Sequence, residues 1–158
     1  MILVGGTLGA GKSYVITQKF PELPQIDPDI YVEKLSGGNG KWNPKMGGKA
    51  RALVQTEFKR FIKEGKSFVK QGVSANLNAV IAQNKIAKDA GFDTIFFYVD
   101  TTLELAQERA NLRFRNGERK NEIPHYKIEK KLKDSKEVYL QLLKMDKFNQ
   151  IILYWNAL

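Results

Sequence analysis

The segment GGTLGAGKS, at residues 5–13, constrains this chain of 158 residues more than any other stretch. It follows the apolar residues 2–4 and fits the pattern G-x-x-x-x-G-K-[ST]. A strand that ends in a glycine-rich turn and opens a helix directs successive backbone N–H groups into one concavity, where phosphate oxygens bind. The fixed positions of the pattern are Gly6, Gly11, Lys12 and Ser13.

This motif, the P-loop, predicts a nucleotide site. Its lysine reaches the β and γ phosphates and its hydroxyl ligates a magnesium ion, so we expect ATP or GTP with Mg²⁺ as cofactors. The alternative is a glycine-rich turn with an incidental Lys-Ser, which the strand before it and the helical pattern after it disfavour. The expected nucleotide-binding residues are Gly6, Thr7, Leu8, Gly9, Ala10, Gly11, Lys12 and Ser13.

Strand and helix patterns alternate along the rest of the chain. This alternation predicts an α/β fold with a doubly wound, mainly parallel five-stranded sheet, helices on both faces and ligands at the carboxyl ends of the strands. We expect one domain over residues 1–158, a flexible basic loop at residues 37–48 and Trp155 in the core. Further strands are expected near residues 25–26, 67–73, 94–99 and 151–155, and helices at residues 14–20, 49–63, 76–90, 103–115 and 126–143.

Composition narrows the class of protein. No apolar run approaches the ~18 residues of a membrane-spanning helix, and no basic segment precedes the first strand, so we expect no membrane span, no signal peptide and a cytoplasmic location. The chain has no cysteine, which excludes disulfides, thiolate catalysis and cysteine zinc sites.

Two carboxylates follow the second strand in the segment QIDPDIYVEKL. Asp27 and Asp29 are expected close to Lys12 and Ser13, where phosphoryl transfer needs a base for the incoming hydroxyl and an acidic ligand for Mg²⁺. The same residues also fit an ordinary helix start, with Asp27 as the N-cap, Pro28 at the first position and Asp29 in the first turn. Both interpretations can hold together.

The order of the segments GGTLGAGKS, IDPD, VDTTLELAQERANLRFRNG and EIPHYKIEKKLKDS resembles the zeta-toxin and polynucleotide-kinase group of P-loop kinases over nearly the whole chain. The resemblance implies a phosphotransferase in which Asp29 activates the acceptor hydroxyl. It also implies a small helical lid, at residues 109–124, that closes on the nucleotide phosphates. Its arginines would be Arg109 and Arg113, with Arg115 as a substitute, although a charged helix face is the alternative.

The chain also departs from this group. Residues 74–78, SANLN, stand where zeta toxins usually carry an acidic residue with threonines, and residues 118–120, ERK, stand where the group often has Gly-His. These departures put the nucleotide-sugar acceptor of zeta toxins in doubt. Asn76 and Asn78 can bind a substrate base or sugar, although an asparagine near a helix start is as often a cap.

The net charge of +9 is concentrated in one part of the chain, since residues 1–40, 41–88 and 89–158 carry −1, +9 and +1. Such a field attracts a polyanion, so we favour a nucleic-acid acceptor: a 5′-hydroxyl end, or a hydroxymethylated base of DNA as in phage DNA-modifying kinases. The alternative is a solvated lysine-rich helix face. The expected substrate contacts are Lys41, Trp42, Lys45 and Lys49, together with Asn76 and Asn78.

Two other functions use the same motif. The first is a kinase of a small molecule such as a nucleotide sugar, nucleoside or antibiotic, for which the basic charge would be incidental. The second is an ATP-switched binding module, with Asp100 at the end of FFYVD as its metal-binding acid. His125, the single histidine, is expected to have a surface or capping role.

Overall fold

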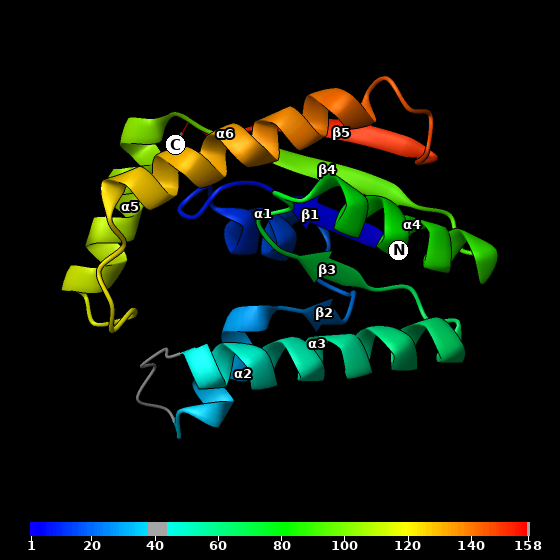
Figure 1. Ribbon diagram of the computed structural model, residues 1–158, viewed down its shortest axis with the longest axis horizontal. Helices are drawn as coiled ribbons and strands as arrows, with labels where there is room; N and C mark the ends of the chain where they lie inside the picture. The colour runs from blue at the N-terminus through cyan, green and yellow to red at the C-terminus, as the bar shows by residue number, and fades with distance from the viewer. Residues whose placement is uncertain (38–43, 158) are drawn as a thin grey trace.

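The computed structural model describes residues 1–37 and 44–157. A parallel five-stranded sheet lies at its centre, in the strand order β2-β3-β1-β4-β5 (Figure 1). The elements in chain order are β1 (Ile2–Gly5), α1 (Lys12–Lys19), β2 (Gln25–Ile26), α2 (Pro28–Leu35), α3 (Pro44–Glu64), β3 (Val69–Gln71), α4 (Leu77–Asp89), β4 (Ile95–Asp100), α5 (Leu103–Arg115), α6 (His125–Leu142) and β5 (Gln150–Trp155).

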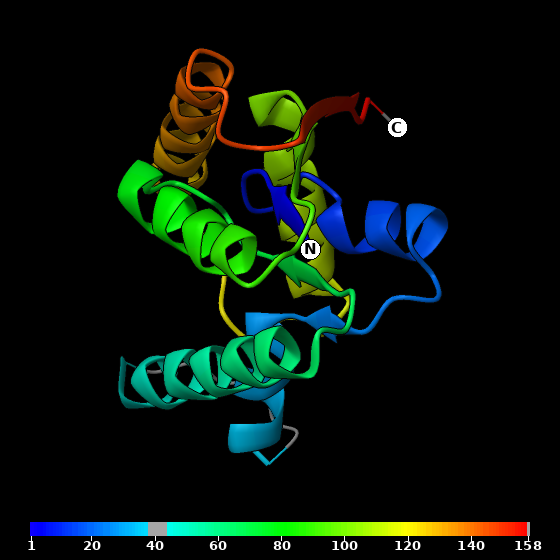
Figure 2. The same cartoon turned by 90° about the vertical axis from the view of Figure 1, so that its right-hand side faces the viewer.

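The two faces of the sheet are covered unequally. Helices α3, α4 and α6 lie on one face and α1 lies on the other (Figure 2). Side chains alternate accordingly along β1, where Leu3 packs toward the three helices while Ile2 and Val4 pack toward α1. Burying each large apolar side chain contributes about 1.5–3 kcal/mol, and Val4, Val15 and Phe68 at the centres of the two layers are nearly inaccessible to solvent.

The topology places the first loop at the centre of the carboxyl edge. From β1 the chain goes first to β2 and β3 on one side and later to β4 and β5 on the other. The order reverses at the carboxyl end of β1, which is where open α/β sheets bind ligands. The predicted α/β fold is therefore confirmed, and the P-loop occupies its switch point. None of the helices within the described residues is long and apolar enough to cross a membrane.

The predicted loop at residues 37–48 is wrong over its second half, because residues 44–48 form the first turns of α3. Pro44 stands at the first helical position, where proline is well tolerated. Gly47 and Ala50 are buried, so the buried face of α3 begins before the segment in which apolar spacing is regular. Lys45 and Lys49 are exposed on this helix. Lys41 and Trp42 lie outside the described residues.

Trp155 is not a core residue, contrary to the expectation from its strand. It is 54% exposed, because β5 is an edge strand that pairs only with β4. Tyr154, one residue earlier, points to the α1 face and packs against Phe97 with 6.0 Å between ring centroids. Because successive side chains of a strand point to opposite faces, Trp155 lies on the face opposite to Tyr154.

Candidate active site

The P-loop is held so tightly that its glycines leave no room for a side chain. Gly9 and Gly11 have φ angles of +78° and +87°, in the left-handed region that glycine adopts freely. A Cβ atom would lie 2.2 Å from the carbonyl oxygen of Ala106 at Gly9, and 2.3 Å from the side-chain nitrogen of Asn156 at Gly11. The loop is therefore packed between α5 and the residue that follows β5.

Hydrogen bonds fix the back of this loop. The buried Asn156 donates from Nδ2 to the carbonyl oxygen of Ala10 at 2.8 Å. Arg109 donates from Nη1 to the carbonyl oxygens of Gly9 and Ala10 at 3.3 and 3.4 Å, and from Nη2 to that of Asn156 at 3.4 Å. Since these carbonyls are bound on one side, the loop is held with its opposite side free to receive phosphate oxygens.

Arg109 therefore has a contact that its predicted lid role does not anticipate. Its guanidinium lies against the P-loop backbone, whereas Arg113, one turn later, is 3.6 Å from Glu118 in an ion pair. Both arginines line a pocket of about 560 Å³ above the loop, which we call the P-loop pocket. Their convergence on one phosphate chain stays a prediction.

Lys12 folds back over the loop that it follows. Its Nζ donates to the carbonyl oxygens of Gly6 and Thr7, both at 2.9 Å. Burial lowers the pKa of Lys12 to about 8, although the nearby Asp29 and Asp27 act in the opposite direction. An anionic phosphate in the P-loop pocket would therefore stabilise the charged form of this lysine.

Asp27 confirms the helix-start interpretation and also faces the site. Its Oδ1 accepts a hydrogen bond from the Asp29 backbone N–H at 2.9 Å, which caps α2, with Pro28 as the first helical residue. Its Oδ2 accepts from Nε2 of Gln71, and burial raises the pKa of Asp27 above its usual range. A partly buried carboxylate of this kind is stabilised by a bound cation.

Gln71 is a site residue that the sequence analysis missed. It ends β3, is 4% exposed, and lies 3.4–3.5 Å from the hydroxyl of Ser13 as well as bonding to Asp27. Its signal in the sequence is a polar residue at a buried strand position just before a glycine. Gln71 thus joins the P-loop hydroxyl to the acid that follows β2.

These oxygens suit Mg²⁺. The hydroxyl of Ser13 and the carboxylate of Asp27 are hard donors, with the amide oxygen of Gln71 beside them. No group of three or more His, Cys, Asp and Glu side chains gathers around a common point within residues 1–37 and 44–157. Such a group is not required, because Mg²⁺ in phosphotransfer sites takes one or two carboxylates and completes its shell with phosphate oxygens and water.

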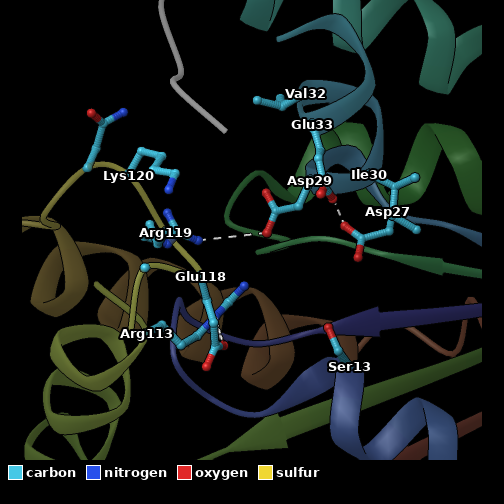
Figure 3. A pocket seen from close by; sticks show the side chains of 12 residues that line it. Ser13, Asp27, Asp29, Ile30, Val32, Glu33, Arg113, Glu118, Arg119 and Lys120 are labelled. Atoms are coloured by element: carbon cyan, nitrogen blue, oxygen red, sulfur yellow. Dashed lines mark hydrogen bonds and ion pairs between the residues drawn. The ribbon is translucent and has the colours of Figure 1, made fainter. Parts of the chain in front are cut away.

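Asp29 and the acids around it form a second pocket of about 420 Å³, the carboxylate pocket, which shares Ser13 and Asp29 with the P-loop pocket (Figure 3). The Asp29 side chain is 66% exposed, and its Oδ2 lies 3.7 Å from Nη2 of Arg119. The carboxylate points across the pocket toward the segment after α5, as the dashed line in Figure 3 marks. Asp29 is thus placed where an acceptor hydroxyl can reach it from solvent.

Arg119 is the second residue that the sequence analysis did not assign to the site. It lines both pockets together with Arg113, whereas Arg115 lines neither. Arg119 is thus an arginine that lies at the two pockets, and the role of Arg115 as a substitute stays a prediction. Arg119 lies in irregular chain beyond α5, where helical spacing cannot place a side chain. The segment at residues 109–124 consists of the second half of α5 followed by this irregular chain.

Other residues named in the sequence analysis line neither the P-loop pocket nor the carboxylate pocket. Asn76 caps α4 by accepting from the Ala79 backbone N–H at 3.0 Å, and Asn78 is exposed on the same helix, so their substrate contacts stay predictions. Asp100 lines neither pocket and pairs with Lys136 at 3.1 Å, so its metal-binding role in a switch module stays a prediction. His125 is exposed, with Nδ1 3.1 Å from Oε1 of Gln107.

The family profile described as zeta toxin matches residues 1–144. The chain belongs to the zeta toxin family. This membership confirms the predicted P-loop kinase class. A comparison with curated protein sequences gives no match.

Solved structures share the fold at low sequence identity. A chain of the PezAT chromosomal toxin–antitoxin system of Streptococcus pneumoniae is similar with a TM-score of 0.78 and 18% identity, over 98% of this chain and 66% of that chain. A chain of the AvrRxo1-ORF1:-ORF2 complex with ATP is similar with a TM-score of 0.74 and 15% identity, over 99% of this chain and 54% of that chain. A chain of the Pnkp1/Rnl/Hen1 RNA repair complex is similar with a TM-score of 0.73 and 15% identity, over 89% of this chain and 45% of that chain. This chain spans less than two thirds of each of these chains.

Replacing Gln71 tests the link between the P-loop and Asp27. We expect Gln71→Leu, which keeps the side-chain bulk but removes the amide, to raise the Mg²⁺ concentration for half-maximal nucleotide binding by about 10–100-fold, as for other residues that orient metal ligands. A Mg²⁺ titration of fluorescent ATP-analogue binding measures this. The control is Gln25→Leu, on the exposed position of β2. An unchanged Mg²⁺ dependence in folded Gln71→Leu protein would contradict the assignment.

The lowered pKa of Lys12 predicts a pH dependence of nucleotide binding. Below about pH 8 the ammonium is charged and binding is insensitive to pH. Above that value the free protein loses this proton and must regain it to bind phosphate, so the affinity falls by up to about tenfold per pH unit. Titrations between about pH 7 and 9.5 measure the slope. Lys12→Gln protein should bind weakly and show no such slope, and an equal slope in both proteins would refute the assignment.

Proposed function

We propose that this protein is an ATP-dependent, Mg²⁺-requiring phosphotransferase that moves the γ-phosphate to an acceptor hydroxyl. One observation carries the proposal: Lys12, the Ser13–Gln71–Asp27 chain and Asp29 meet where the P-loop pocket joins the carboxylate pocket. A nucleotide and an acceptor bound in these two pockets would have their reacting groups side by side. Such positioning supplies most of the catalysis in phosphoryl transfer.

In the proposed reaction, Asp29 accepts the proton of the acceptor hydroxyl while the hydroxyl oxygen forms a bond to the γ-phosphorus. The bond from the γ-phosphorus to the bridging oxygen breaks, and ADP leaves. Lys12 exchanges the carbonyls of Gly6 and Thr7 for phosphate oxygens, and Arg113 and Arg119 neutralise charge on the transferred group. Ser13 and Asp27 would hold a Mg²⁺ ion here, which would supply positive charge to offset that of the phosphate groups.

For the acceptor we favour a nucleic acid, as a 5′-hydroxyl end or a hydroxymethylated DNA base. The support is the +9 charge of residues 41–88, part of which lies on the exposed Lys45 and Lys49 of α3. Other cations of this segment are neutralised locally, as Arg60 is by Glu57 and Glu64. The fold likeness to a component of an RNA repair complex is compatible with such a substrate.

A small-molecule acceptor has its own support. The carboxylate pocket has a volume of about 420 Å³, within the ~300–1,000 Å³ typical of small-ligand sites. Three basic and four acidic side chains line it, which suits a compact polar substrate: Arg113, Arg119 and Lys120, and Asp27, Asp29, Glu33 and Glu118. A reaction panel with γ-labelled ATP, single- and double-stranded oligonucleotides, nucleosides and nucleotide sugars separates the two acceptors. No labelled product and no Lys12-dependent ATP hydrolysis would refute the phosphotransferase.

Asp29→Asn tests the general base. We expect turnover to fall by ~10²–10⁴ while ATP affinity changes little, because the amide cannot accept the proton. Asp27→Asn should instead raise the Mg²⁺ requirement and loosen the start of α2. Turnover and ATP binding are measured at saturating Mg²⁺, with Lys12→Ala as the inactive reference. If Asp27→Asn costs more turnover than Asp29→Asn under these conditions, the two roles are reversed.

The nucleic-acid acceptor predicts a salt dependence. Replacing Lys41, Lys45 and Lys49 with glutamine should weaken oligonucleotide binding similarly for all base sequences and leave ATP binding unchanged. For every lysine that binds a backbone phosphate, its replacement should flatten the slope of log affinity against log salt by about 0.7–0.9. Trp42→Ala serves as the comparison, because a stacking residue would change affinity by ~1–3 kcal/mol and leave the slope unaltered. An unchanged slope in the lysine variant would favour the small-molecule kinase.

A further inference from the structure

A third, smaller cavity lies on the other side of β3 from the metal-binding oxygens. It has a volume of about 180 Å³ and is walled by Lys70 of β3, by Ser74 and by the first turns of α4. Alternation along β3 separates two functions: Gln71 contacts Ser13 and Asp27 on one face, while Lys70 turns toward the face covered by α3 and α4. We call this cavity the Lys70 pocket.

The charge in the Lys70 pocket is not balanced by an acid. Burial lowers the pKa of Lys70, and no carboxylate lies within ion-pair distance of it among the described residues. The polar side chains that share its walls are neutral: Gln71, Ser74, Asn76 and Gln83. By contrast, Lys66, which precedes β3, and Lys85 of α4 are paired with Glu64 and Asp89. Partial burial of an ammonium group without a counter-charge is costly, and a bound anion removes that cost.

The Lys70 pocket also adjoins the proposed reaction site. Gln71 lines both the Lys70 pocket and the P-loop pocket. Ser74, on the wall of the Lys70 pocket, has a φ of +56°, which a residue other than glycine adopts only when its surroundings enforce it. Those surroundings are close: a Cβ at Gly5 would lie 3.0 Å from the Cβ and Oγ of Ser74. Ser74 is therefore packed closely against the end of β1.

We propose that the Lys70 pocket binds an anionic group of the acceptor, a phosphate or a carboxylate, while the hydroxyl to be phosphorylated lies at Asp29. The proposal rests on the proposed function, because it gives that acceptor a second point of attachment. The volume of 180 Å³ is below the size of a whole-ligand site, which fits one functional group rather than a base or sugar. The acceptor is accordingly an anion, held by its charge beside the site of transfer.

The test separates anion binding from phosphotransfer. Isotope-labelled protein is first saturated with a non-hydrolysable ATP analogue and Mg²⁺, so that the P-loop is filled, and is then titrated with inorganic phosphate or acetate. Amide shifts at Lys70, Gly72 and Ser74 and the side-chain amide of Gln83 report on the pocket. We expect saturable shifts there. Failure to bind the analogue would count against the proposed function, whereas analogue binding without these shifts would overturn only the present inference.

Two variants assign the effect to the lysine. Lys70→Met keeps the aliphatic stem, and should raise the dissociation constant for phosphate at least about tenfold, as expected for loss of a charged hydrogen-bond donor. Lys70→Arg keeps the charge and should retain most of the binding. Lys88→Met removes an exposed charge from the other end of α4 and should change nothing. Equal binding by wild-type and Lys70→Met protein would overturn the inference, and the wild-type titration stands alone if that variant does not fold.

The source of the anion is identified with two further probes. Thymidylyl-thymidine, whose single phosphate is a diester, represents a nucleic-acid backbone, and thymidine 5′-monophosphate represents a small phosphorylated acceptor. Binding of the dinucleotide that depends on Lys70 supports a nucleic-acid acceptor. Binding of the monophosphate alone supports an anionic small molecule. If both bind equally well to wild-type and Lys70→Met protein, the acceptor does not use this pocket and the proposal fails.

Discussion

The shape of the nucleotide site depends on the hydrogen bonds that the carbonyl oxygen of Ala10 accepts from Asn156 and Arg109. These bonds join the loop after the first strand to a residue after the last strand and to a helix between them. A glycine-rich loop has many accessible conformations, and fixing it has an entropic cost. Partners brought by β5 and α5 offset that cost, so the phosphate cradle forms only when the β4–β5 side of the sheet is assembled.

The contacts of Gln71 with Asp27 and Ser13 also depend on the assembly of the sheet. Ser13 belongs to the first helix, Asp27 caps the second and Gln71 ends the third strand, yet their side chains form one continuous chain of contacts. Parallel pairing of β2 and β3 with β1 brings these residues to one edge. Buried polar groups of this kind are stabilising only while every member has its partner. The pairing of three strands therefore sets the geometry of the metal-binding oxygens.

What the sequence could reveal depended on how local each feature is. The P-loop and the Asp27 cap are contiguous motifs whose residues interact within a few positions, and both are found as predicted. Gln71 and Arg119 act on residues more than forty positions away, through strand register and an irregular segment that no periodicity describes. The first turns of α3 were missed because glycines there weaken the local helix signal, and tertiary burial of Gly47 overrides it.

The exposed position of Trp155 gives the protein an optical property. Its indole is 54% exposed and precedes Asn156, the residue that is bonded to the P-loop. Indole emission follows the polarity around the ring, so a nucleotide that orders the chain at this edge changes the spectrum of Trp155. The sequence has two tryptophans, and a Trp42→Phe protein would carry a single indole, one residue before Asn156. Occupancy of the loop could then be followed in real time without a label.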